Sequence, residues 1–416
     1  LASDLMVKDK AYSQAHLPIA QQQTAIGHAV RFVYLMTGVA HLARLSHDES
    51  KRQDCLRLWN NMAQRQLYIT GGIGSQSSGE AFSSDYDLPN DTVYAESCAS
   101  IGLMMFARRM LEMEGDSQYA DVMERALYNT VLGGMALDGK HFFYVNPLEV
   151  HPKSLKFNHI YDHVKPIRQR WFGCACCPPN IARVLTSIGH YLYTPREDAL
   201  YINIYAGNSM EVPVENGTLR LRVSGNYPWQ EQVTIAVESP QPVRHTLALR
   251  LPDWCTQPQI ILNGEEVEQD IRKGYLHITR EWQEGDTLNL TLPMPVRRVY
   301  GNPLVRHVAG KVAIQRGPLV YCLEQADNGE SLHNLWLPAD APFTTFEGKG
   351  LFSHKILIQA PGYRYEQSNP EQQPLWHYDS APAKRQPQTL TFIPWFSWAN
   401  RGEGEMRIWV NEETSA

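Results

Sequence analysis

Apolar residues in the first half of the chain recur mostly at helical spacing, from about residue 18 to residue 193. Side chains three or four positions apart lie on one helix face, so each such stripe predicts a partly buried helix. We expect five helices, marked by Ala25, Ala29, Phe32, Val33 and Met36 with an end near Gly38; by Leu56, Trp59, Met62 and Leu67 with an end before Gly71; by Ile101, Met104, Met105 and Met110; by 121–132; and by 181–192. Asp91 or Thr92 is expected to cap the third, and 141–145 is expected to form a short strand.

The pattern changes after Pro195 to short alternating runs separated by Asn-Gly, Gly and Pro turns. Such runs predict β-strands, here at 199–205, 218–223, 232–237, 245–251, 259–262, 275–279 and 287–292. One longer strand is expected at 312–323, followed by a looser β region from residue 335. The predicted fold class is therefore α+β, with a helical domain at 1–193, a β-sandwich at 194–297 and a second β domain at 298–416.

Length, charge and hydropathy indicate a multidomain protein without a nucleic-acid-binding surface or a membrane helix. A chain of 416 residues is long enough for two or three domains. The net charge of −6 and the lack of Lys or Arg runs argue against a nucleic-acid-binding surface. No segment reaches the roughly 20 consecutive apolar residues of a membrane helix. The sequence starts with Leu1-Ala2-Ser3, without a start Met or signal-peptide features, so we expect it to begin inside a longer gene product.

Cysteines provide the first candidate chemistry. Three of the seven fall within four residues, at Cys174, Cys176 and Cys177, directly before Pro178-Pro179 and a predicted helix start. Adjacent thiolates can bind one soft metal ion such as zinc, and a helix N-terminus favours the thiolate over the thiol. The odd, clustered count indicates reduced thiols and favours a cytoplasmic setting.

Spacing alone leaves three interpretations of these cysteines open. They form a purely structural zinc site of Cys98, Cys174, Cys176 and Cys177, or a metal site with a catalytic thiolate, or they are uncoordinated buried cysteines. Glu96 and Glu80 precede Cys98 and add carboxylates that can ligate a metal or transfer a proton. Considered singly, several candidates have simpler interpretations: Glu80 as a loop residue, Glu124 as an exposed helix charge, His28 as a core histidine, Tyr144 as a strand aromatic, and Cys55, Cys255 and Cys322 as core residues.

Eight sequence blocks, in a fixed order, favour a functional interpretation of these residues. They are Ile26-Gly27-His28-Ala29-Val30-Arg31, Thr70-Gly71-Gly72-Ile73-Gly74, Gly79-Glu80-Ala81-Phe82, Asp85-Tyr86-Asp87-Leu88-Pro89-Asn90, Tyr94-Ala95-Glu96-Ser97-Cys98, Glu124-Arg125-Ala126-Leu127-Tyr128-Asn129, Phe143-Tyr144-Val145-Asn146-Pro147-Leu148 and Cys176-Cys177-Pro178-Pro179-Asn180. In order and approximate spacing the chain resembles glycoside hydrolase family 127, the bacterial β-L-arabinofuranosidases.

The resemblance implies a role for each matched position. Cys176 corresponds to a nucleophile that is also a zinc ligand, and Glu96, Cys98 and Cys177 correspond to the other ligands. Glu80 corresponds to the general acid/base. Residues that hold the arabinofuranose ring correspond to His28, Glu124 and Tyr144. Cys174 has no role carried over from the family.

The implied activity is that of a zinc-dependent retaining exo-glycosidase, which releases L-arabinose from terminal β-L-arabinofuranosides in an oligosaccharide. A rival from another class is a non-catalytic carbohydrate-binding protein with a structural zinc ion. A third is a structural assembly domain, which absence of zinc and formation of disulfides would favour.

The family's catalytic domain resembles an (α/α)6 toroid of about twelve helices, whereas this chain offers only about five or six before the β region. The chain is therefore expected to begin midway round the toroid. Apolar flanks that other helices would cover should then be exposed and drive association. We expect these 416 residues alone to be poorly stable or self-associated, for example as a homodimer, and at best weakly active.

Overall fold

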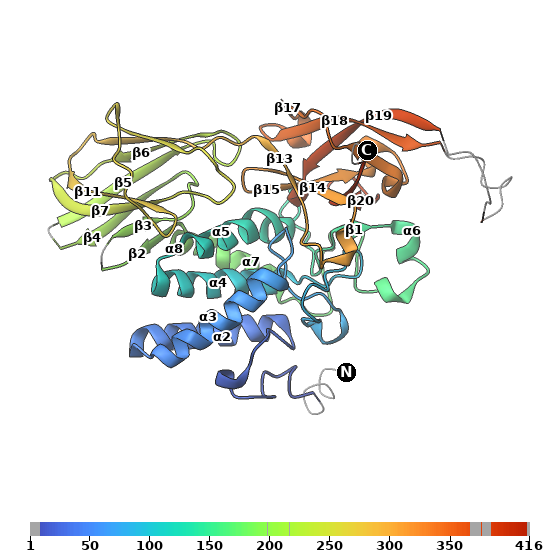
Figure 1. The fold of residues 1–416 in the computed structure, drawn as a ribbon, viewed down its shortest axis with the longest axis horizontal. Coiled ribbons are helices and arrows are strands. Elements are labelled where there is room, and N and C mark those ends of the chain that lie inside the picture. Colours follow the sequence, from blue (N-terminus) through green and yellow to red (C-terminus); the bar gives the residue numbers. More distant parts are fainter. Residues whose placement is uncertain (1–8, 198, 216, 367–375, 377–383, 414–416) are drawn as a thin grey trace.

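Helices come first in the chain and two β regions follow, both lying along one side of the helical layer (Figure 1). The computed structural model describes residues 9–197, 199–215, 217–366, 376 and 384–413. No helix among these residues is long and apolar enough to cross a membrane.

The main helices each bury one face in a shared core. Their bounds are α2 (Ala29–Ser46), α3 (Glu49–Arg65), α4 (Ser97–Glu114), α5 (Ser117–Ala126), α7 (Cys177–Thr186) and α8 (Gly189–Leu192), with the short α6 (Pro152–Leu155) and α9 (Gln325–Asn328) at the periphery. Single turns lie at η1 (Ile19–Gln21), η2 (Ser78–Glu80), η4 (His159–Tyr161), η5 (Arg306–Val308), η6 (Leu332–Asn334), η7 (Gly350–Phe352) and η8 (Trp395–Ser397), and η3 (Leu127–Val131) is a π-helical segment. Phe32, Val33 and Met36 of α2 are fully buried, as their spacing predicts.

The helix ends differ from the sequence prediction. Helix α2 does not stop at Gly38 but continues to Ser46. A glycine inside a helix costs only about 1 kcal/mol, and the buried Val39, Ala40 and Ala43 repay it by extending the apolar stripe. Asp91 and Thr92 do not cap the third helix, which starts after Glu96.

Two further expectations are corrected. The fourth helix, expected at 121–132, is α5 followed by the π-helical η3, and the fifth, expected at 181–192, begins at Cys177 and breaks between α7 and α8. The expected strand at 141–145 is absent from the described structure. Phe142 and Val145 form only isolated bridges, with Met135, Gln169 and Glu96.

The first β region contains two sheets whose apolar faces share one core. A five-stranded sheet has the order β10-β11-β7-β3-β2, and a six-stranded sheet has the order β4-β5-β6-β12-β8-β9. The strands are β2 (Tyr193–Pro195), β3 (Leu200–Ile202), β4 (Asn208–Val214), β5 (Gly217–Gly225), β6 (Gln232–Val237), β7 (Val243–Arg250), β8 (Gln259–Leu262), β9 (Glu265–Glu266), β10 (Ile271–Arg272), β11 (Tyr275–Trp282) and β12 (Thr287–Thr291). Leu221 and Ile235 of one sheet and Leu247 of the other belong to the same buried cluster.

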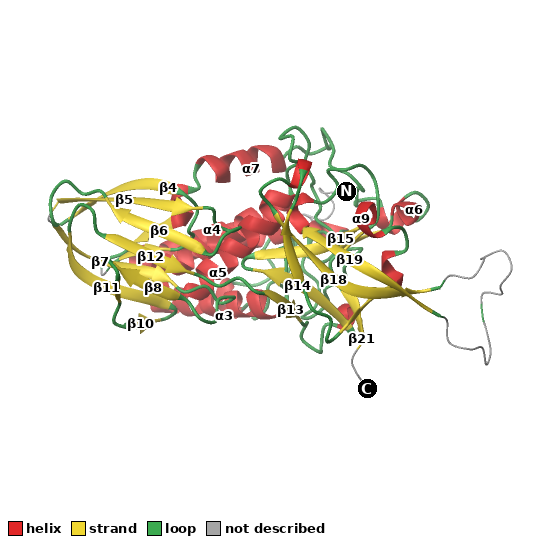
Figure 2. Cartoon of the chain, turned by 90° about the horizontal axis from the view of Figure 1, so that it is seen from above, coloured by secondary structure: helices red, strands yellow, loops and turns green. Residues whose placement is uncertain are grey.

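The second β region is a ten-stranded sheet with the order β1-β20-β15-β19-β18-β16-β21-β14-β13, and β17 pairs with β18. Figure 2 shows this sheet apart from the two sheets of the first β region. Its strands are β13 (Val296–Val299), β14 (Lys311–Arg316), β15 (Leu319–Glu324), β16 (Leu335–Pro338), β17 (Thr344–Glu347), β18 (Ile356–Tyr365), β19 (Arg385–Pro394), β20 (Met406–Arg407) and β21 (Val410–Glu413). Its end strand β1 (Glu149–Val150) comes from the helical half.

The single long strand expected at 312–323 is instead the hairpin of β14 and β15. Gly317 turns the chain with a φ of 53°, a left-handed conformation that favours glycine. Because both strands are buried on both faces, the sequence reads as one continuous apolar run. The mixed order of helices and then sheets matches the prediction, while the domain boundaries at 193 and 297 stay predictions.

Candidate metal and active site

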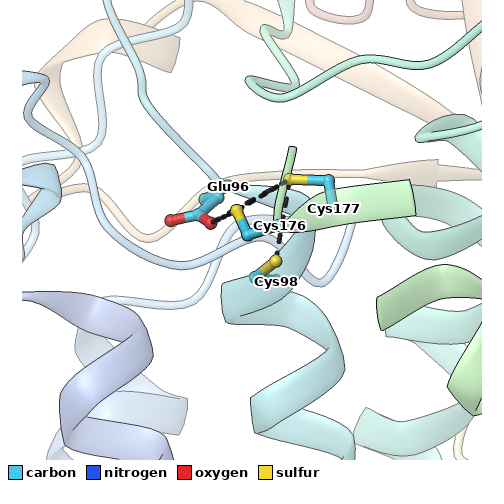
Figure 3. A group of neighbouring side chains, drawn as sticks. All are labelled: Glu96, Cys98, Cys176 and Cys177. Atoms are coloured by element: carbon cyan, nitrogen blue, oxygen red, sulfur yellow. Dashed lines mark hydrogen bonds between the residues drawn. The ribbon is translucent and has the colours of Figure 1, made fainter. Parts of the chain in front are cut away.

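Two helix starts bring four acidic side chains together (Figure 3). Glu96 precedes the first residue of α4 and Cys98 lies in its first turn, whereas Cys176 precedes α7 and Cys177 begins it. Their potential ligand atoms all lie within 4.8 Å of one another. Since a helix N-terminus favours negative charge, both helices support thiolates and a carboxylate at this point.

The distances within this sulfur cluster match those of a tetrahedral site. Cys98 Sγ lies 3.6 Å and Cys176 Sγ 3.7 Å from Cys177 Sγ. Glu96 Oε1 lies 3.3 Å from Cys176 Sγ and 3.9 Å from Cys177 Sγ. Ligands at zinc–sulfur bond lengths and tetrahedral angles would lie about 3.8 Å apart. The four side chains therefore stand where such a metal would hold them.

Burial, neighbouring charge and hydrogen bonds shift the pKa values of the side chains in the sulfur cluster. Cys177 is fully buried, and Glu96 and Cys98 are each only 3% exposed. Burial, and then the charge of Cys176, raise the pKa of Glu96. Hydrogen bonds with Cys176 and Cys177 lower the pKa of Cys98 to about 5. Hydrogen bonds with Cys176, and then with Cys98, raise the pKa of Cys177.

The charge of the cluster points to a cation. Ionised groups this close repel one another, so a divalent cation would relieve the repulsion. Glu96 Oε2 is buried without a hydrogen-bond partner in the described structure, and it is free for a metal. The donor set of three thiols and one carboxyl is one that zinc accepts.

The cluster opens into a cavity of about 820 Å³. Its lining residues come from the N-terminal segment, the starts of α2, α4 and α7, the turn η2 and two loops. They are Tyr12, His28, Val30, Arg31, Tyr34, Glu80, Glu96, Cys98, Tyr144, Cys174, Cys176, Pro179, Asn180 and Arg183. Cys176 and Glu80 therefore face the same space, which is large enough for a sugar ring.

Glu80 is held by His28. The two side chains meet at 3.0 Å, between His28 Nε2 and Glu80 Oε2. The Arg31 N–H donates to His28 Nδ1 at 3.4 Å, so Nε2 carries the ring proton and donates it to the carboxylate. An oxygen of Glu80 also lies within 4.8 Å of one of Glu96, which places Glu80 beside the sulfur cluster.

The surroundings of Glu80 shift its pKa in opposite directions. Burial raises the pKa of Glu80, whereas hydrogen bonds from His28 and Tyr94 lower it. The hydrogen bonds have the larger combined effect, so the net pKa lies below the usual carboxyl value. Glu80 also has a φ of 51°, a left-handed conformation that costs free energy in a non-glycine residue. Strain of this kind is concentrated at functional sites.

Tyr144 lies at the cavity wall, in ring contact with Tyr94 and Phe172. Burial raises its pKa, and a hydrogen bond to Cys176 adds to the rise. Its hydroxyl therefore stays protonated and can donate to a thiolate.

The structure does not bring Glu124 to this cavity. Its side chain is 1% exposed and lies 2.6 Å from Arg250 Nη2, while Trp254 Nε1 donates to its second oxygen at 3.0 Å. Tyr227 adds a further hydrogen bond. Glu124 thus joins α5 to the first β region.

Cys174 also lies apart from the ligand group. It is exposed at the cavity lining, and Glu96 occupies the fourth position instead. This arrangement favours a ligand group of three cysteines and Glu96 over a purely four-cysteine site.

Sequence reasoning missed several cavity residues. Tyr34 accepts hydrogen bonds from Asn180 at 3.0 Å and from Arg183 at 2.9 Å, which links α2 to α7 beside the cysteines. A hydrogen bond with Asn180 also helps to lower the pKa of Cys98. Asn180 stood within a matched block and was available as a signal, whereas nothing in the sequence distinguished Tyr34 from a core aromatic.

Three family models match nearly the whole chain. "Beta-L-arabinofuranosidase, GH127 catalytic domain" matches residues 1–190, the GH127 middle domain matches 199–294, and the "Glycoside hydrolase family 127 C-terminal domain" matches 296–411.

Characterised and solved relatives agree with these matches. The chain is 40% identical over 97% of its length to a "Non-reducing end beta-L-arabinofuranosidase" of Bifidobacterium longum, of which it covers 62%. It is 48% identical, with a TM-score of 0.93, to the crystal structure of a GH127 β-L-arabinofuranosidase from Geobacillus stearothermophilus T6, covering 97% of this chain and 63% of that one. A second GH127 β-arabinofuranosidase is 34% identical with a TM-score of 0.87, covering 97% of this chain and 63% of that one. The chain therefore spans less than two thirds of the length of these relatives.

Proposed function

Since the chain belongs to glycoside hydrolase family 127, we propose that it is a retaining exo-glycosidase that releases L-arabinose from terminal β-L-arabinofuranosides. The observation that carries the proposal is the shared cavity, into which Cys176 of the sulfur cluster and the carboxyl of Glu80 both open. An oligosaccharide ending in arabinofuranose is the proposed substrate.

The proposed cofactor is zinc, held by Glu96, Cys98, Cys176 and Cys177. The tetrahedral spacing, the unpartnered Glu96 Oε2 and the sulfur-rich donor set support it. When bound, the ion would keep the Cys176 sulfur ionised and improve it as a leaving group.

In the first step, the Cys176 sulfur attacks the anomeric carbon and the bond from that carbon to the leaving oxygen breaks. Glu80 gives its proton to that oxygen, and a thioglycosyl bond to Cys176 results. To do so Glu80 must be protonated in the complex. A bound sugar would exclude water from the cavity and strengthen the burial effect that already raises the pKa of Glu80.

In the second step, Glu80 removes a proton from water, which attacks the anomeric carbon and releases Cys176. Two successive inversions at that carbon give overall retention. A sulfur nucleophile here takes the place that a second carboxylate occupies in most retaining glycosidases.

His28 and Tyr144 remain in the proposal as residues that contact the sugar, because both line the cavity. His28 additionally positions Glu80 through its Nε2–H. For Glu124 we propose a different role, in which it fixes α5 against β7, because its oxygens are already bonded to Arg250, Trp254 and Tyr227.

A partial (α/α)6 toroid is the proposed form of the helical half. In support, α2 exposes Leu42 and Leu45, each 58% accessible. Such an apolar face is typical of a helix that packs against another. We retain the domain boundaries at 193 and 297, self-association such as a homodimer, and a cytoplasmic setting as proposals, the last because all seven cysteines are free.

Hydrolysis of an aryl β-L-arabinofuranoside, combined with metal analysis, tests the function. The chain should contain zinc and release arabinose of retained configuration, with the Geobacillus relative as a positive control. Mass spectrometry of a rapidly quenched reaction should find a pentosyl group on the Cys176 peptide. A zinc-loaded chain that binds arabinofuranosides but neither hydrolyses them nor becomes labelled would favour the rival carbohydrate-binding protein.

A further inference from the structure

A second group of metal-binding side chains lies outside the sulfur cluster, where the helical half joins the C-terminal sheet. His151, His333 and Glu405 each offer one ligand atom, and these atoms lie within 4.8 Å of one another. His151 follows β1, Glu405 precedes β20, and His333 lies in η6. Figure 1 shows β1 beside β20, and the two strands pair antiparallel.

The two ligands from the C-terminal domain are held by neighbours. The Leu332 N–H donates to Glu405 Oε2 at 2.8 Å, which fixes the carboxylate against the turn that carries His333. Gln325 bonds the Glu405 backbone on both sides, at 2.9 Å each. Asn411 Nδ2 donates to the His333 carbonyl at 2.7 Å. The positions of both ligands are thus set before any ion binds.

His151 is oriented by a carboxylate from its own segment. Its Nε2 lies 2.7 Å from Glu149 Oε1, and Arg407 Nη1 lies 3.7 Å from the same oxygen. Carboxylates commonly orient metal-binding histidines in this way, holding one ring nitrogen so that the other is presented to the ion. With Nε2 donating to Glu149, Nδ1 is available as the ligand atom.

We propose that His151, His333 and Glu405 bind a divalent transition ion of the zinc type, which joins the helical half to the C-terminal domain. Two imidazoles and one carboxylate form a donor set that zinc accepts, with water in the fourth position. Because the three ligands meet only when both parts are folded and docked, the ion stabilises that junction by mass action.

Counting bound zinc in three versions of the whole chain tests this site independently of the sulfur cluster. The purified chain is loaded with Zn²⁺, freed of excess by gel filtration, and analysed by atomic emission. His333→Ala should lower the content by one equivalent, and this exposed residue can be changed without opening the core. His159→Ala is the matched control, since its side chain is 95% exposed and carries no ligand role. It should retain the full content.

Two equivalents in the wild-type chain and one in His333→Ala would support both metal sites. One equivalent in the wild-type chain and none in His333→Ala would support this site and indicate that the sulfur cluster binds no zinc. Equal zinc content in His333→Ala and His159→Ala would overturn the proposal. Glu149→Gln should weaken zinc binding at this site by about 10–100-fold in a chelator competition, because the carboxylate that orients His151 is lost while all three ligands remain. Added Zn²⁺ should raise the thermal midpoint further in His159→Ala than in His333→Ala.

Discussion

Two groups of buried acids lie in the helical half, and they differ in the source of their countercharge. On α5, Asp121 and Glu124 face the guanidinium of Arg250, at 2.7 Å and 2.6 Å. At the starts of α4 and α7, Glu96 lies among three thiols, and no Lys or Arg pairs with it among the residues that the structure describes. The chain itself supplies a guanidinium to the first group, whereas the second group has the donor set that a metal ion could bind.

This difference separates a structural role from a chemical one. A buried carboxylate that is fully paired stabilises a domain junction but has little freedom to react. A cluster of unpaired acids is costly to fold, and such clusters occur where a metal or a reaction uses them. Resemblance alone placed Glu124 at the sugar, and its bonding partners now favour the junction.

Replacing Cys176 with Ser should give the largest effect. We expect a loss of about 10⁴-fold or more in kcat, because the hydroxyl is a far weaker nucleophile than a zinc-held thiolate. Hydrolysis of an aryl β-L-arabinofuranoside measures it, and Cys255→Ser, outside the cavity, is the control. Near-normal turnover in Cys176→Ser would remove the sulfur from the mechanism.

Glu80→Gln should come next, with a loss of about 10³-fold on substrates with poor leaving groups. Activated aryl substrates should lose less in the first step, because their leaving oxygen needs no proton. Comparing rates across a series of phenols of different acidity measures this dependence. Equal losses across the series would contradict the acid role.

Arg250→Met tests the paired group. Removing the guanidinium leaves Glu124 and Asp121 buried without a countercharge, so the free energy of unfolding should fall by about 3 kcal/mol or more. Urea denaturation followed by circular dichroism measures the loss. A triple variant that removes all three charges should recover part of the stability. Its substitutions are Asp121→Asn, Glu124→Gln and Arg250→Met. No difference between the two variants would mean that charge pairing is not what holds this junction.

His28→Ala should produce the smallest effect, a shift in pH dependence. The His28 hydrogen bond favours the charged form of Glu80 and lowers its pKa, so its loss should raise that pKa. Because the first step needs protonated Glu80, kcat/KM falls as pH rises through this pKa. The alkaline limb of the profile should therefore move to higher pH in the variant. An unchanged limb, with only KM altered, would restrict His28 to sugar contact.

Much of the fold could be predicted because local patterns decide it. Strands β6 and β8 match their predicted bounds, and in β6 the alternation with one buried face is directly visible in the sequence. The predictions failed where tertiary contacts prevail over local signals. Gly38 is tolerated within α2 because its neighbours are buried, and the apolar run through Gly317 concealed a hairpin.

At the candidate site, the sequence predicted which residues take part better than it predicted which side chains contact one another. Cys176 and Cys177 were conspicuous through their adjacency, and the resemblance added Glu96 and Cys98. The His28–Glu80 contact joins residues far apart in sequence, and the histidine site at the C-terminal junction joins residues still further apart. No periodicity encodes such long-range pairs, so only the folded chain shows them.

Strand β1 has a consequence for how the chain is made. It emerges from the ribosome well before its partner β20, because more than 250 residues separate the paired positions in the sequence. Until β20 has been made, the end of the helical half has an unsatisfied backbone edge, which is open to wrong partners. A stalled or truncated product ending before β20 should therefore be more prone to aggregation than its mostly intact sequence suggests, and expression trials should place tags and truncations accordingly.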